Sequence, residues 1–141
     1  MTDTALTLNG VLETALYVDD LARARAFYED IMGLRAMSLS ERLAAYPVGP
    51  KSVLLLFQKG LTDQPLDTPG GTIPPHGGSG RLHYAFAIPA EQMDGWLDRL
   101  AGHGVAIEST VSWPRGARSL YFRDPDGNMV ELVTPGLWAN Y

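Results

Sequence analysis

The chain has 141 residues, a length that suits one domain (1–141), and its 45% hydrophobic and 19% charged residues are typical of globular proteins. A net charge of -5, from 16 acidic and 11 basic residues, disfavours a nucleic-acid partner, and the absence of cysteine excludes disulfides, thiolate metal ligands and thiol nucleophiles. The longest aliphatic run, Val53–Leu56, is far shorter than a membrane span of about 20 residues. The polar N-terminal segment predicts no signal peptide. We therefore expect a cytoplasmic protein directed at a small molecule.

The first predicted elements are a strand over Val11–Val18 and a helix over Leu21–Met32. Apolar residues alternate along the strand and then recur at helical spacing. Asp19 and Asp20 provide an N-cap, and Gly33 suits the end of the helix. Turn residues then separate three short predicted strands, around Arg35–Leu39, Arg42–Val48 and Ser52–Gln58.

Residues 59–80 are rich in glycine and proline and contain few apolar side chains. We expect no helix or strand there, and we interpret the segment as a linker or a functional loop. The earlier pattern then begins again with a strand over Leu82–Ile88 and a helix around Met93–Leu100. Three further strands complete it, at Val105–Thr110, Ser119–Arg123 and Asn128–Thr134.

The order of strand, helix and three strands therefore occurs twice, with an offset of 70 residues between Leu12 and Leu82. Such a repeat determines the architecture. We predict an α+β fold in which two tandem βαβββ modules form a cupped mixed sheet with helices on the outside. Module one spans about 10–58, the linker 59–80 and module two about 81–135.

A carboxylate and an imidazole occupy equivalent positions in the two repeats. Alternation along the second repeat's first strand places His83 opposite the apolar side chains that meet the helix, and the offset places Glu13 at the same position in the first repeat. The small neighbours Ala15 and Ala85 leave room beside both. An isolated histidine on a strand is usually an ordinary surface residue, but this equivalence makes His83 a candidate functional residue.

Glu131 is the third candidate. It lies in the apolar run NMVELVT, where a carboxylate costs free energy unless it is paired or bound to a cation. The preceding residues Asp124–Gly127 predict a turn, because proline restricts φ and glycine adopts positive φ. This turn places Glu131 in the middle of the last strand.

Two segments resemble a known superfamily: LETALYVDDLARARAFYEDIMGL (12–34) and SLYFRDPDGNMVELV (119–133). They are similar to the vicinal oxygen chelate superfamily of glyoxalases, bleomycin-resistance proteins, fosfomycin-resistance enzymes and extradiol dioxygenases. The resemblance covers roughly residues 10–135. It implies paired βαβββ modules around a cupped sheet. It also implies a divalent metal, held by the first and last strands of the modules, to which substrate oxygens bind.

Carried onto this sequence, the resemblance implies that Glu13, His83 and Glu131 are metal ligands and that Glu131 is catalytic. Members with three protein ligands most often have two histidines and a glutamate, so Glu13 departs from the pattern. Leu55 or Leu56, depending on strand register, stands where some members have a fourth ligand. Two carboxylates and one imidazole favour Mn²⁺, Fe²⁺, Ni²⁺ or a Mg²⁺-like ion, and Zn²⁺ is also compatible. Three ligands leave positions open for substrate oxygens, as Lewis-acid catalysis requires.

Several other side chains are candidates for substrate contact. His76 is either an ordinary solvated loop residue or part of a lid over the site. Arg118 would bind an anionic substrate or serve solubility alone. The aromatic residues expected in the wall of the pocket, or else in the core, are Tyr46, Phe57, Trp113 and Tyr121.

Two classes of function fit these residues. One is a divalent-metal-dependent lyase, isomerase or dioxygenase acting on a small oxygen-chelating substrate. The other is a metal-free, antibiotic-like binding protein, which the departure at Glu13 and the missing fourth ligand support. We favour the enzyme, because a binding protein has no need of both His83 and Glu131. The resemblance also implies a homodimer, with the metal site either within one chain or between two.

Overall fold

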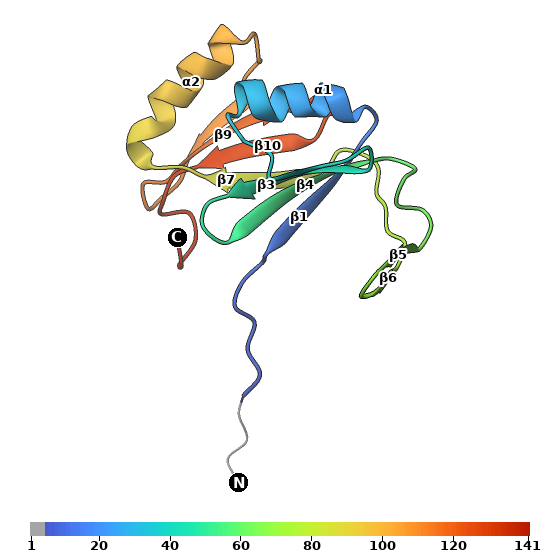
Figure 1. Cartoon of the computed structure of the whole chain (residues 1–141). Helices are drawn as coiled ribbons and strands as arrows, with labels where there is room; N and C mark the ends of the chain where they lie inside the picture. The colour runs from blue at the N-terminus through green and yellow to red at the C-terminus, as the bar shows by residue number, and fades with distance from the viewer. Residues whose placement is uncertain (1–4) are drawn as a thin grey trace.

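The computed structural model describes residues 5–141, and the first half of the chain forms a four-stranded mixed sheet with one helical segment (Figure 1). The strand order is β1-β4-β3-β2, with β1 parallel to β4 and the other pairs antiparallel. The elements in chain order are β1 (Glu13–Val18), α1 (Leu21–Ala26), the π-helical turn η1 (Phe27–Ile31), β2 (Ser38–Leu39), β3 (Leu43–Val48) and β4 (Ser52–Gln58). Residues 1–4 of the segment predicted to contain no signal peptide lie outside the described residues.

The second half repeats this arrangement with the strand order β7-β10-β9-β8. Its elements are β7 (His83–Ala87), the 3₁₀ turn η2 (Ala90–Gln92), α2 (Met93–Gly102), β8 (Ser109–Ser112), β9 (Arg118–Arg123) and β10 (Met129–Val133). In the first sheet Ala15 pairs with Leu55, and in the second Ala85 pairs with Glu131. The predicted α+β fold of two βαβββ units is thus confirmed. The offset of 70 residues holds between β1 and β7, whereas equivalent residues of β4 and β10, such as Leu55 and Glu131, lie 76 residues apart.

The two sheets share one core beneath the helices. Figure 1 shows α1 and α2 on the same side of the sheets. The even-numbered residues of the strands other than β2 face them, and in β2 the odd-numbered Leu39 does so. Leu56 of β4 and Leu132 of β10 are fully buried in one cluster. Phe27 of η1 contacts Phe122 of β9 with ring centroids 6.2 Å apart, so the first helical segment packs on the second sheet as well. No helix within residues 5–141 combines the length and the apolar character needed to cross a lipid bilayer.

The segment 59–80 differs from the prediction, because it contains a small hairpin of β5 (Leu66–Thr68) and β6 (Gly71–Ile73). Two residues, Pro69 and Gly70, join the strands, and two-residue turns favour hairpins. The Thr72 hydroxyl donates a hydrogen bond to Asp67 Oδ1 (2.7 Å) and supports the pairing. The expectation of no regular structure here was wrong, because hydrogen bonds across a tight turn replace the missing apolar contacts.

Candidate metal and ligand site

The candidate residues lie on the sheet faces turned away from the helices, which we call the open faces. Odd-numbered residues of neighbouring strands share them, except in β2, where Ser38 does, as the register requires. The first open face includes Glu13, Ala15, Tyr17, Leu43, Ala45, Val53, Leu55 and Phe57. The second includes His83, Ala85, Met129, Glu131, Ser119 and Tyr121.

His83 and Glu131 lie together on the second open face. His83 Nε2 is 3.3 Å from Glu131 Oε1, and the exposed fractions of the two side chains are 53% and 6%. The other ring nitrogen, His83 Nδ1, lies 3.1 Å from the carbonyl oxygen of Met129, which fixes the orientation of the ring. A nitrogen donor and a carboxylate oxygen thus lie side by side at a position open on the histidine side.

Ser119 holds the second oxygen of this carboxylate, and the sequence analysis missed it. Its buried hydroxyl donates to Glu131 Oε2 (2.5 Å) and accepts a hydrogen bond from Trp113 Nε1 (2.8 Å). Trp113, a predicted wall of the pocket, therefore acts on Glu131 through Ser119. Alternation in the sequence places Ser119 and Tyr121 on one face of β9. The β9–β10 register, which the sequence does not contain, shows that this is the face of Glu131.

Tyr121 lies beside the same pair. Its ring centroid is 6.4 Å from that of His83, and its backbone pairs with Glu131 across β9 and β10. Partial burial raises the pKa of the Tyr121 phenol, and the charge of Glu131 acts in the same direction. Tyr121 is therefore a neutral hydrogen-bond donor at pH 7.

The first open face contains a cavity of about 570 Å³. Its lining residues are Glu13, Ala15, Met37, Ser38, Arg42, Leu43, Ala45, Val53, Leu55, Phe57, Ile73 and His76. Glu13 is exposed in this cavity, and neither His83 nor Glu131 lines it. Within residues 5–141 of a single chain, no three histidine, aspartate or glutamate side chains are grouped closely enough to hold a metal. One chain thus brings two of the three predicted ligands together.

His76 forms one end of this cavity and is anchored on β1. Its Nδ1 lies 2.7 Å from the Tyr17 hydroxyl, and its ring contacts Phe57 edge-on with centroids 4.8 Å apart. The loop beyond it lies so close to Tyr17 that a Cβ on Gly78 would be 2.8 Å from Cδ2 of the ring. His76 and Phe57 therefore lie where a ligand on the first open face would touch them.

Two other predicted contact residues lie away from the open faces. Tyr46 is fully buried in the core, and its hydroxyl donates to Glu29 Oε2 (2.9 Å). Arg118 is exposed at the beginning of β9, on the opposite side of the strand from Ser119 and Tyr121.

The strand register also decides between the two leucines at the fourth-ligand position. Leu55 pairs with Ala15 as Glu131 pairs with Ala85, whereas Leu56 is buried in the core. Leu55 is therefore the residue equivalent to Glu131.

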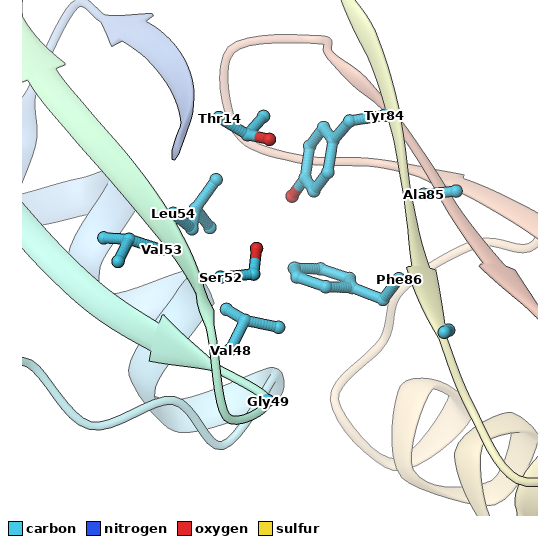
Figure 2. Close-up of a pocket in the computed structure, with 10 residues that line it drawn as sticks. Thr14, Val48, Gly49, Ser52, Val53, Leu54, Tyr84, Ala85 and Phe86 are labelled. Atoms are coloured by element: carbon cyan, nitrogen blue, oxygen red, sulfur yellow. The ribbon is translucent and has the colours of Figure 1, made fainter. Parts of the chain in front are cut away.

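A second hollow lies between the two sheets (Figure 2). It has a volume of about 300 Å³, and the rings of Tyr84 and Phe86 on β7 face Thr14, Ser52 and Val48 across it. Tyr84 and Phe86 pack against the shared core, and none of the predicted site residues lines this hollow. It is a junction between the sheets and not part of the candidate site.

The paired βαβββ units and the His–Glu pair on an open sheet face define the class of protein to which this chain belongs. Residues 10–132 match the Glyoxalase/Bleomycin resistance protein/Dioxygenase superfamily. The chain belongs to this superfamily, as its resemblance to the vicinal oxygen chelate proteins predicted.

Individual relatives have different activities. A catechol-2,3-dioxygenase of Bacillus subtilis (strain 168) is 30% identical over 122 residues, which are 83% of this chain and 38% of that protein. The metallothiol transferase FosB of Shouchella clausii is 25% identical over 129 residues, 90% of this chain and 81% of that protein. The crystal structure of a lactoylglutathione lyase from Agrobacterium tumefaciens has 36% identity and a TM-score of 0.82, with 94% of this chain and 98% of that chain covered.

Proposed function

We propose that this protein is a divalent-metal-dependent enzyme acting on a small oxygen-chelating substrate, with Glu13, His83 and Glu131 as metal ligands. The observation that carries the proposal is the pair of His83 Nε2 and Glu131 Oε1, 3.3 Å apart. A carboxylate that is 6% exposed on a strand costs free energy unless it is hydrogen-bonded, paired or bound to a cation, and the exposed imidazole beside it adds a nitrogen donor. Nitrogen and oxygen donors without sulfur fit Mn²⁺, Fe²⁺, Ni²⁺ or Zn²⁺.

A divalent ion at this position would act as a Lewis acid toward substrate oxygens. The side chains around it have separate tasks. Ser119 orients the Glu131 carboxylate, and the Met129 carbonyl orients the His83 ring. Tyr121, whose ring lies beside that of His83, would donate its phenolic proton in a hydrogen bond to a substrate oxygen.

Glu13 completes the ligand set from a second copy of the chain in this proposal. The isolated position of Glu13 supports this arrangement, because one chain offers two of the three ligands. The segment before β1 extends away from the sheets (Figure 1), and Leu6 and Leu8 on it are 99% and 98% exposed. Exposed apolar residues of this kind favour contact with another chain.

The metal content of the untagged protein tests the proposal first. Plasma mass spectrometry should find about one divalent ion per chain, and titration of Mn²⁺, Fe²⁺, Ni²⁺, Co²⁺ or Zn²⁺ into stripped protein should raise its melting temperature. H83A and E131A should abolish both effects, whereas exchange of the exposed Asp98 for asparagine should leave them unchanged. If no ion binds and none shifts the melting temperature, the proposal is wrong.

In that event the second candidate function, a metal-free binding protein, takes its place. The separation of Glu13 from the other two predicted ligands within one chain favours this candidate. The cavity on the first open face would then be the binding site.

Mixing two inactive variants tests the contribution of the second copy. E13A and H83A each lack one ligand, but a mixed dimer regains one intact site, with Glu13 from the H83A chain and His83 and Glu131 from the E13A chain. Random exchange makes about half of the dimers mixed, so about a quarter of the sites should bind metal. Recovery of no metal binding in the mixture, while the wild type binds it, would contradict the contribution of Glu13 from a second copy.

A further inference from the structure

The two open faces have equivalent backbones and opposite chemistry. The register places three polar residues of the second face at positions that carry apolar residues in the first. The equivalent pairs are Glu131 and Leu55, Ser119 and Leu43, and Tyr121 and Ala45. The second open face therefore presents polar side chains to a ligand, and the first open face presents apolar side chains at the same positions.

The apolar face is hollow and reaches the proposed ligand Glu13. The cavity of about 570 Å³ contains Glu13 together with Val53, Leu55 and Phe57. Glu13 on β1 pairs directly with Val53 on β4, and Leu55 follows two residues further along the same face. A group bound beside the Glu13 carboxylate therefore touches the apolar wall without a gap.

Two of the polar side chains that line this cavity, those of Arg42 and His76, are already engaged. Arg42 Nε donates to the carbonyl oxygen of Leu61 (3.3 Å), and its guanidinium lies over the Phe57 ring, 5.4 Å from the centroid. His76 is bonded to the hydroxyl of Tyr17. Among the described lining residues, Arg42 is the one permanently cationic side chain, so the cavity is poorly suited to a small polyanion.

We infer that the substrate is amphipathic, with a chelating pair of oxygens at one end and a hydrocarbon body, aromatic or branched, that binds on Val53, Leu55 and Phe57. This inference rests on the proposed function, because the chelating end is assigned to the metal held by Glu13, His83 and Glu131. Burial of the hydrocarbon against these side chains would provide affinity, and the metal ligands would set its orientation.

Two hydroxamates test this inference, because they share one chelating group and differ in hydrocarbon. In metal-loaded protein, 2-naphthohydroxamate should bind at least about tenfold more tightly than acetohydroxamate, as the larger apolar area predicts. Leu55→Gln should remove most of this difference, and Val53→Thr, which hardly changes the volume, should reduce it. Leu39→Gln is the matched control, since Leu39 is half-exposed and faces the opposite side of its sheet.

A third probe separates this inference from the proposed function. 2-Naphthol has the ring without the chelating pair, and its fluorescence reports binding to metal-stripped protein. Binding that Leu55→Gln weakens and Leu39→Gln does not supports the hydrocarbon site even if no metal binds. If metal binds but the two hydroxamates have equal affinity in wild type and Leu55→Gln, the inference is wrong and the metalloenzyme proposal stands.

Discussion

Ser119 connects a tryptophan to the carboxylate at the centre of the candidate site. Its hydroxyl donates a hydrogen bond to Glu131 Oε2 and accepts one from the indole N–H of Trp113. Glu131 Oε1 therefore remains the oxygen turned toward His83. Loss of a hydrogen-bonding group that orients a metal ligand typically lowers metal affinity by about 10- to 100-fold.

Ser119→Ala should weaken metal binding by about tenfold or more and should lower stability by about 1–3 kcal/mol, because two partly or fully buried groups lose their partner. Ser119→Thr, which keeps the hydroxyl, should restore much of the affinity. Titration calorimetry measures the metal affinity, and the fluorescence of Trp113 reports metal binding independently. Comparison with W113F shows how much of the emission of the three tryptophans comes from Trp113. An unchanged metal affinity in Ser119→Ala would show that Ser119 has a packing role only.

The sequence predicted single residues well where alternation along one strand was sufficient. His83 and Glu131 share a face because each faces away from the apolar residues of its own strand. The predicted triad itself remains a prediction. The role of Ser119 and the core position of Tyr46 depend on pairing between strands, and a sequence read strand by strand does not contain that register.

At the scale of elements, the turn between β9 and β10 joins the two halves of the chain. Asp124 is buried, with 4% of the residue exposed. Its carboxylate accepts hydrogen bonds from the backbone amides of Asp126 and Asn128 and from Asn128 Nδ2, all at 2.9 Å. It also accepts the hydroxyl proton of Tyr28 from η1 (2.7 Å). One carboxylate thus closes its own turn and binds the helical segment of the first half.

Asp124→Asn should lower the free energy of unfolding by about 2 kcal/mol or more, because an amide nitrogen replaces an acceptor that faces several donors. Tyr28→Phe should also lower stability, since it removes the contact to η1 and leaves the hydroxyl of Tyr84 without its acceptor, although the turn itself stays intact. Chemical denaturation measures both, and Asp98→Asn on the exposed side of α2 provides the control. Equal stability of Asp124→Asn and Asp98→Asn would contradict this role of the turn.

The elements themselves were predictable where periodicity extended over several residues, as in β7 and α2. Local chemistry determined the rest. The predicted helix over 21–32 changes at Phe27 into a π-helical turn, which leaves the adjacent residues Phe27 and Tyr28 both buried. The hairpin of β5 and β6 has three residues in each strand, too few to show alternation.

At the scale of the whole molecule, the buried phenols between the halves link stability to alkaline pH. Tyr84 of β7 donates its hydroxyl proton to the hydroxyl of Tyr28 (2.6 Å). Burial raises the pKa of both phenols well above the ordinary value of 10.0. The folded chain holds these protons more tightly than the unfolded chain, so the stabilisation is complete below pH 10 and is lost as the pH rises above it.

Denaturation between pH 9 and 11 should therefore show a falling free energy of unfolding, with a slope of about 1.4 kcal/mol per pH unit for each proton released. Tyr84→Phe removes one such proton and should make the slope shallower. Tyr141→Phe, at the partly exposed end of the chain, should change the slope less. The same slope in wild type and Tyr84→Phe would exclude this linkage.

The two-residue period of β4 separates the tasks of neighbouring side chains. Leu54 and Leu56 hold the shared core, while Val53 and Leu55 between them line the cavity. Substitutions of Val53 and Leu55 can change which ligand binds while the core residues stay the same. New specificity can therefore arise with little loss of the small free energy that stabilises a folded protein. Within this one strand, substitutions that change the ligand and residues that maintain the fold therefore occupy alternate positions.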